Sequence, residues 1–105
     1  MTPKVGEVYI LDLGYEGKTR PIIIMSREDP QAPRAVSVFV PLTKESRNSR
    51  YEVAMPRVPW LKLQSYANVQ GMGSVGYHEL TERRGRFDAA VVARIKEAIR
   101  WTFDL

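Results

Sequence analysis

The sequence predicts a mainly β protein that ends in one α-helix. Several short segments rich in β-branched and aromatic residues follow one another, and prolines or glycines separate them. A helical spacing of apolar residues marks the last part of the chain, from residue 88 on. The 105 residues, 44% of them apolar, suit a single domain, residues 1–105, with one modest core. Five or six short strands and one packed helix therefore predict a small barrel-like sheet.

The first two strands are separated by a polar loop. Residues 7–13 are rich in β-forming side chains and end at Gly14, a pattern typical of a strand that enters a turn. Residues 14–20 are polar and include a second glycine, so we expect a flexible connection. Pro21 cannot complete the hydrogen bonds of a central strand and predicts the entry to a strand over residues 22–25.

The middle of the chain predicts shorter strands. Residues 35–40 alternate between two faces, and Pro41 is expected to end that strand. Further strands are predicted over residues 51–55 and 66–69. The three glycines between residues 71 and 76 predict a loose or bulged stretch.

The helix is expected to begin after Asp88, a residue type that caps helix N-termini well. The apolar residues that follow recur at helical spacing and predict one buried stripe. They are Val91, Val92, Ile95, Ala98, Ile99 and Phe103.

Composition excludes several functional classes. The chain has no cysteine and a single histidine, His78, which excludes disulfide scaffolds, zinc–thiolate sites and histidine-based metal clusters. The longest aliphatic run, residues 22–25, is far shorter than the roughly 20 residues of a membrane span, and the N-terminus carries no apolar signal region. We therefore expect a soluble cytoplasmic protein that needs neither a metal nor a cofactor.

The charge balance favours an anionic partner. Sixteen Lys and Arg residues against twelve Asp and Glu residues give a net charge of +4, and arginines outnumber lysines by eleven to five. Arginine matches phosphate groups with a planar, bidentate fork. This composition makes nucleic acid a more frequent partner than for an average domain.

Arg20 and Thr43 are the first candidate functional residues. Arg20 precedes a rigid proline and a buried strand, a place where a guanidinium could stabilise phosphate charge. Thr43 follows the strand over residues 35–40, where its hydroxyl could donate to a phosphate oxygen. Position alone favours plainer interpretations: a surface arginine, and a threonine that caps the local backbone.

Two further features stay open. His78 titrates in the range useful for proton transfer, but a structural or exposed histidine is the commoner case. Arg83, Arg84 and Arg86 could hold a phosphate backbone or form a solvated turn before the helix. No phosphate-binding loop, nucleophile elbow or HExxH motif is present in the sequence.

Three segments together resemble a known family. They are residues 5–13 (VGEVYILDL), 17–26 (GKTRPIIIMS) and 40–43 (VPLT). The chain is similar in these motifs to the MazF/PemK toxin family, whose pattern is roughly G-D/E-I/V-Y/W-x-V/I-D, then R-P before an aliphatic strand, and later P-L/I-T/S. The resemblance covers nearly the whole chain, because the family also ends in a helix.

The resemblance implies a small SH3-like barrel of the MazF/PemK/CcdB type that forms a homodimer. It also implies a metal-independent, sequence-specific endoribonuclease (mRNA interferase), the toxin of a toxin–antitoxin pair, which a cognate antitoxin neutralises. Arg20 matches the arginine of the family's R-P motif and Thr43 its P-L-T hydroxyl. The implied reaction is attack of a ribose 2′-OH on the adjacent phosphate, which yields a 2′,3′-cyclic phosphate and a 5′-OH.

Single-stranded RNA, including mRNA, is the implied substrate, and polar loops on either side of these motifs are expected to hold it. The predicted RNA-binding residues are Tyr15, Glu16, Lys18, Thr19, Lys44, Arg47, Arg50, Asn68 and Gln70. Val69 and Met72 stand where many members carry an Asp and a basic residue. The alternative is therefore a toxin module on the same barrel that binds RNA without cleaving it, or that binds a protein target such as a topoisomerase.

Overall fold

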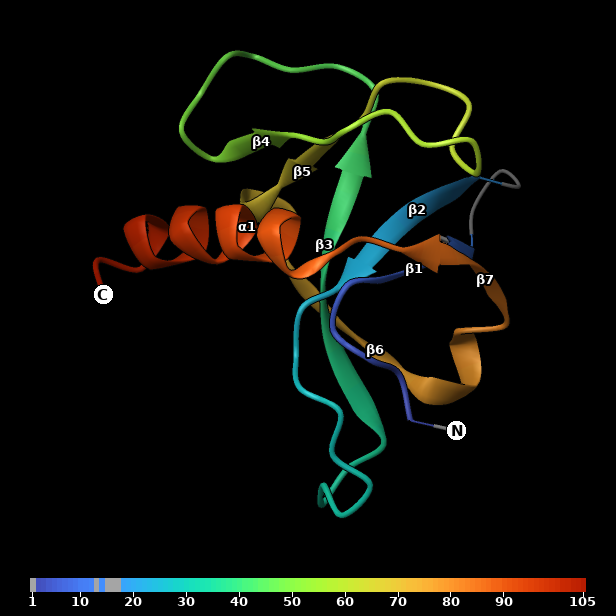
Figure 1. Cartoon of the computed structure of the whole chain (residues 1–105). Coiled ribbons are helices and arrows are strands. Elements are labelled where there is room, and N and C mark those ends of the chain that lie inside the picture. The colour runs from blue at the N-terminus through green and yellow to red at the C-terminus, as the bar shows by residue number, and fades with distance from the viewer. Residues whose placement is uncertain (1, 13, 15–17) are drawn as a thin grey trace.

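The computed structural model describes residues 2–12, 14 and 18–105, and seven strands and one α-helix lie within this part of the chain (Figure 1). The strands are β1 (Glu7–Asp12), β2 (Thr19–Ile24), β3 (Val36–Thr43), β4 (Glu52–Ala54), β5 (Tyr66–Asn68), β6 (Gly73–Gly76) and β7 (Glu82–Arg86). Two short 3₁₀ helices, η1 (Val69–Gly71) and η2 (Tyr77–Glu79), flank β6, and α1 (Ala89–Thr102) follows β7.

The strands form a curled antiparallel sheet in the order β4-β5-β3-β2-β1-β7. Strand β3 is the longest and pairs with β6 along its first half and with β5 at its end. The predicted fold class, a mainly β barrel-like sheet with a C-terminal helix, is confirmed.

Strand β2 begins earlier than the sequence predicts. Arg20 and Pro21 lie inside the strand, opposite Leu11 and Ile10 of β1, and not in a loop before it. The reason is that β1 and β2 form a hairpin whose pairing continues to Thr19. Arg20 is thus held by a hydrogen-bonded ladder on the β1 side, while its side chain stays exposed.

Pro41 does not end β3, contrary to the prediction. Val38 directs its N–H to Ser26 Oγ and its C=O to Met25 N, both next to β2. Backbone groups alternate along a strand, so the nitrogen of Pro41 faces the opposite side. On that side, β3 pairs with β6 up to Phe39 and with β5 from Leu42 on. Pro41 lies between the two pairings, so its missing N–H removes no ladder hydrogen bond.

The main core lies between the sheet and α1. Val8, Ile23 and Val40 contribute fully buried side chains from three neighbouring strands, and Ile95 of α1 packs against them. Asp88 caps the helix as predicted, because its carboxylate accepts a hydrogen bond from the N–H of Val91. Phe103 departs from the predicted buried stripe: it terminates the helix and is 59% exposed.

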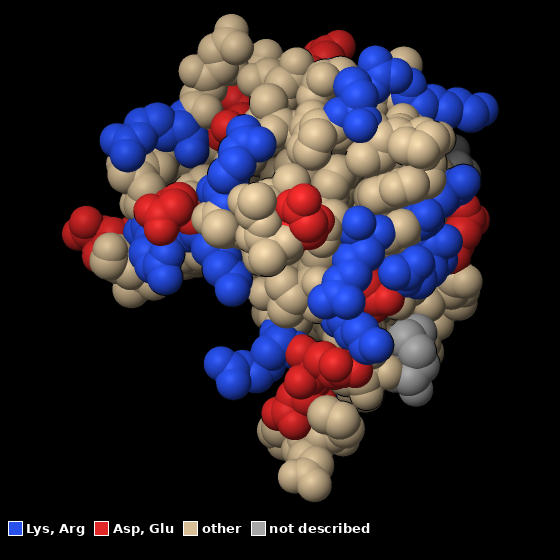
Figure 2. Space-filling view, in the orientation of Figure 1, with Lys and Arg blue, Asp and Glu red and all other residues tan. Residues whose placement is uncertain are grey.

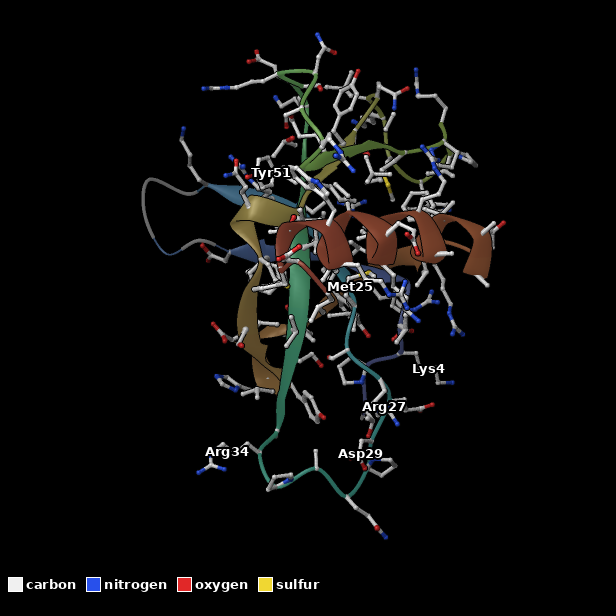
Figure 3. All side chains as sticks on the ribbon, turned by 90° about the vertical axis from the view of Figure 1, so that its left-hand side faces the viewer. Lys4, Met25, Arg27, Asp29, Arg34 and Tyr51 are labelled. Atoms are coloured by element: carbon white, nitrogen blue, oxygen red, sulfur yellow. The ribbon has the colours of Figure 1, made fainter. Side chains whose placement is uncertain are left out.

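Two other predicted loops are strands. The glycine-rich stretch forms β6, and Arg83, Arg84 and Arg86 belong to β7 and not to a turn. At the far end of the molecule, Arg27, Asp29 and Arg34 lie on the loop that projects away from the sheet, opposite the end at which Tyr51 lies (Figure 3). Among the described residues, no helix is long and apolar enough to cross a membrane.

A buried carboxylate joins the N-terminal segment to β7. Glu7 is 8% exposed, and it accepts hydrogen bonds from Arg83 Nε at 2.7 Å, from the N–H of Lys4 at 2.6 Å and from the Tyr9 hydroxyl at 3.3 Å. Burial alone would raise the pKa of the Glu7 carboxyl, but these hydrogen bonds and the Arg83 charge hold the pKa below its ordinary value of 4.5.

We expect Glu7→Gln to destabilise the fold by about 1–3 kcal/mol at neutral pH. Because the pKa is lower in the folded state, the stabilisation is complete above about pH 4.5 and is lost as the pH falls through the folded-state value. The stability difference between wild type and Glu7→Gln should therefore shrink as the pH is lowered in denaturant titrations. Glu97→Gln, at a side chain that is 74% exposed, is the control and should change little. Parallel pH profiles for wild type and Glu7→Gln would contradict this role of Glu7.

Candidate nucleic-acid interface

An open groove of about 1180 Å³ crosses the sheet where β2 begins and β3 ends. The loop after β3, residues 44–51, lies on one side, and the segment over residues 60–65 contributes another wall. The candidate residues that line it are Thr19, Arg20, Thr43, Lys44, Arg47, Asn68 and Gln70. These candidates come from three separate parts of the sequence, over residues 19–20, 43–47 and 68–70, and meet at one surface.

Arg20 and Thr43 line this groove at the adjoining ends of β2 and β3. Strands β2 and β3 pair as Ile24 with Phe39, Ile23 with Val40 and Ile22 with Pro41. Continued by two residues, this register would set Arg20 level with Thr43, although the two strands no longer pair there. Residues at the same level of neighbouring antiparallel strands project to the same face of the sheet. The fold therefore brings both candidate catalytic residues to one place.

Pro21 explains why this end of the two strands is open. Ile24 directs its C=O to the N–H of Gly6, on the β1 side, so alternation places the nitrogen of Pro21 on the β3 side. Pro21 has no N–H to donate, and the pairing of β2 with β3 stops at Ile22. The strands part there, and Arg20 stays accessible.

The Thr43 hydroxyl has local partners in this structure. It donates to the carbonyl oxygen of Glu45 at 3.1 Å and lies 3.4 Å from the carbonyl oxygen of Tyr66. The half-buried side chain is held at the groove by these contacts. A phosphate oxygen that approaches Arg20 would compete with these carbonyls for the hydroxyl proton.

Glu52 shapes the loop that carries Lys44 and Arg47. Its carboxylate accepts the N–H of Arg47 at 3.0 and 3.1 Å, the N–H of Ser49 at 3.1 Å and the Ser49 hydroxyl at 2.7 Å. The Ser49 hydroxyl and the backbone N–H groups lower the pKa of the Glu52 carboxyl. These hydrogen bonds occupy the carboxylate and leave the charges of Lys44 and Arg47 exposed.

Not every predicted RNA-binding residue lines the groove. The Arg50 guanidinium lies 4.4 Å from the centre of the Trp101 ring, which also packs edge-on against Tyr51. Lys18 is exposed beside the groove but is not among its lining residues. Tyr15 and Glu16 lie outside the described residues.

The groove residues on β5 and η1, Asn68 and Gln70, are uncharged. Asn68 accepts the N–H of Gln70 through its side-chain oxygen at 3.1 Å, and this bond caps η1. Val69 is buried in the main core and Met72 packs against it, so neither lines the groove. His78, whose role the sequence leaves open, is exposed on η2 and does not line it either.

Several groove residues were missed by sequence reasoning. The lining residues not among the predicted candidates include Glu52, Trp60, Lys62, Gln64, Ser65 and Arg84. Most of them lie far from the motifs in sequence, and only folding brings them near Arg20. For Arg84, the sequence signal is the arginine cluster over residues 83–86, for which phosphate binding is one of the two interpretations given above.

The groove has a cationic lining. Of the described residues that line it, five are basic (Arg20, Lys44, Arg47, Lys62 and Arg84) and two are acidic (Glu45 and Glu52). Figure 2 shows further Lys and Arg side chains gathered over the region where β7 lies in Figure 1. Among the residues that the structure describes, no group of His, Cys, Asp and Glu could hold a metal ion. A groove lined by these cations can bind and polarise an anion.

A small, mainly β, barrel-like sheet with a cationic groove defines a class of anion-binding proteins. The pattern of the family described as PemK-like, MazF-like toxin of type II toxin–antitoxin system matches residues 4–103. The chain belongs to this family.

Solved structures agree with this assignment. An endoribonuclease in complex with its cognate antitoxin from a mycobacterial species is 30% identical, with a TM-score of 0.85 over 98% of this chain and 96% of that chain. The Mycobacterium tuberculosis toxin MazF-mt6 is 25% identical, with a TM-score of 0.80 over 94% and 97% of the two chains. MazF from Deinococcus radiodurans, 16% identical with a TM-score of 0.81 over 100% and 99%, shows the same fold. No curated protein sequence matches significantly.

Proposed function

We propose that this toxin is a metal-independent endoribonuclease that cleaves single-stranded RNA in the groove at the ends of β2 and β3. The observation that carries the proposal is that Arg20 and Thr43 line one cationic groove at the adjoining ends of β2 and β3. The solved relatives described as an endoribonuclease and as MazF-mt6 support the same activity.

The proposed reaction is an internal transesterification. The 2′-OH of one ribose attacks its own 3′-phosphate, the bond from phosphorus to the 5′-oxygen of the next nucleotide breaks, and a 2′,3′-cyclic phosphate and a 5′-OH remain. The proton lost by the 2′-OH is balanced by the proton gained by the leaving oxygen. Arg20 stabilises the charge that develops on the phosphate oxygens, and Thr43 donates a hydrogen bond to them.

The remaining groove residues hold the substrate in this proposal. Lys44 and Arg47 contact the RNA backbone, and Asn68, Gln70 and Thr19 supply hydrogen-bonding groups for the nucleotides. Sequence specificity would come from these polar groups and not from the backbone contacts.

The proposal extends to partners and location. The chain acts as a single toxin domain, residues 1–105, in a cytoplasmic homodimer that a cognate antitoxin inhibits. A relative in complex with its cognate antitoxin supports the last point. The surplus of groove cations fits an acidic antitoxin segment that competes with RNA for the Arg20 surface.

Incubation of a long single-stranded RNA with the protein in EDTA tests the proposal. We expect discrete fragments with cyclic-phosphate ends, and we expect Thr43→Val, which removes only the hydroxyl, to slow their formation about 10–100-fold. Thr81→Val is the matched control, because Thr81 is exposed and does not line the groove. Intact RNA that still binds with a steep salt dependence would replace the proposal by a non-cleaving RNA-binding module, and absence of RNA binding would favour a protein target.

A further inference from the structure

Strand β7 contains a β-bulge at Arg84. Tyr9 of β1 lies opposite Arg83 and Val8 lies opposite Gly85, so Arg84 is an extra residue with no partner in β1. Bulges redirect side chains and are frequent next to functional sites. Arg84 also lines the groove that contains Arg20, although the two residues are more than sixty positions apart in the sequence.

Gly85 and Trp60 hold this bulge in place. A Cβ atom on Gly85 would lie 2.4 Å from Trp60 Cε2, so the backbone of the bulge rests directly on the indole ring. The ring in turn packs against the buried Phe87, with centroids 4.9 Å apart. Because this packing already fixes the backbone of Arg84, this backbone loses little conformational entropy when a ligand binds.

The Arg84 guanidinium is available to a ligand. Its Nη2 atom lies 2.6 Å from a carboxylate oxygen of Glu82, and the two side chains are 48% and 54% exposed. An exposed pair of this kind contributes little to stability. A guanidinium has five N–H donors, so a phosphate can bind beside Glu82 without breaking the pair.

Arg84 and Arg20 reach the groove from opposite sides of β1. One strand, β1, separates β2 from β7, and Ile10 of β1 lines the groove between them, paired with Pro21 and Glu82. The backbones of Arg20 and Arg84 are two strand spacings apart across the sheet and two to three residues apart along the strand direction. Together these offsets amount to about 10–15 Å. A neighbouring phosphate of the same strand is within reach of Arg84.

We propose that Arg84 is a second RNA-binding residue, which contacts a phosphate next to the scissile one and directs the RNA across β1 toward β7. The inference rests on the proposed function, since it takes RNA as the ligand of the groove. Arg84 binds the substrate and does not touch the reacting atoms, so it affects KM and not kcat.

The test measures the binding of a 2′-O-methylated single-stranded RNA of mixed sequence, which lacks the attacking hydroxyl, at several salt concentrations. We expect Arg84→Ala to weaken binding about tenfold and to reduce the slope of log K against log salt by about 0.7. Arg84→Lys should keep the slope, because the charge remains. With cleavable RNA, Arg84→Ala should raise KM and leave kcat unchanged.

Arg94→Ala is the matched control: it removes the same charge from an exposed position of α1 outside the groove, and its slope should equal that of wild type. If Arg84→Ala also keeps the wild-type slope and KM, the inference is overturned while the proposed function stands. If wild type neither binds nor cleaves single-stranded RNA, both are overturned. If Arg84→Ala lowers kcat and leaves the salt slope unchanged, the assignment of Arg84 to a neighbouring phosphate is wrong.

Discussion

Replacement of Arg20 by alanine is expected to lower the rate of RNA cleavage about 10²–10³-fold. This corresponds to a loss of about 2–4 kcal/mol of transition-state stabilisation, the range for removing one preorganised donor from developing charge. The side chain is exposed and forms no ion pair with any residue that the structure describes, so the fold should be unchanged. Single-turnover cleavage of a short RNA in EDTA, with circular dichroism of both proteins, measures the two effects separately.

Two companion variants sharpen this experiment. Arg20→Lys keeps the charge but not the planar fork, so it should recover only part of the rate. Arg34→Ala removes the same charge from the projecting loop at the far end of the molecule (Figure 3) and should cleave as wild type does. If Arg20→Ala and wild type cleave at equal rates, the phosphate-stabilising group must lie elsewhere in the groove.

Replacement of Gly6 by alanine should be among the most destabilising single-methyl additions to this chain. Gly6 has a φ of +91°, and a Cβ atom there would lie 2.7 Å from the carbonyl oxygen of Phe87. The backbone cannot retreat, because Gly6 donates to Ile24 O at 2.8 Å and accepts the N–H of Phe87 at 2.9 Å. We expect a loss of about 2–4 kcal/mol, the sum of the left-handed backbone cost and the collision.

Gly14 provides the control for this prediction. Its φ is +78°, but no atom of the described residues lies within 4 Å of the position that a Cβ would occupy. Gly14→Ala should therefore lose only the backbone contribution, about 1 kcal/mol. Chemical denaturation of both variants compares them directly, and equal losses would show that the contact with Phe87 has no effect on stability.

Local sequence patterns predicted most of the elements because short-range physics determines them. The helix from Ala89 to Thr102, its Asp88 cap and the strands around residues 7–12 follow from β propensity, helical periodicity and capping chemistry. The errors involve prolines and glycines. Pro41 lies inside β3 because no ladder hydrogen bond needs its missing N–H there, whereas Pro21 lies inside β2 through its pairing with β1 and ends the pairing with β3. Both outcomes depend on which strand lies on each side.

The candidate catalytic residues could be identified from the sequence because they stand next to their motifs, R-P and P-L-T. The resemblance to the MazF/PemK family also came from the linear order of such motifs, and the match over residues 4–103 confirms it. The roles of Arg20 and Thr43 stay predictions until the variants are measured.

The sequence by itself determined the fold class, the family and the residue types available for phosphate chemistry, since each depends on the local order of side chains. Only the tertiary structure decided which of these residues meet. The antiparallel pairing of β2 with β3 brings Arg20 and Thr43 to one groove, and the bulge packed on Trp60 adds Arg84 to the same groove. Register and bulge positions arise from contacts between strands distant in the chain, so no local pattern encodes them.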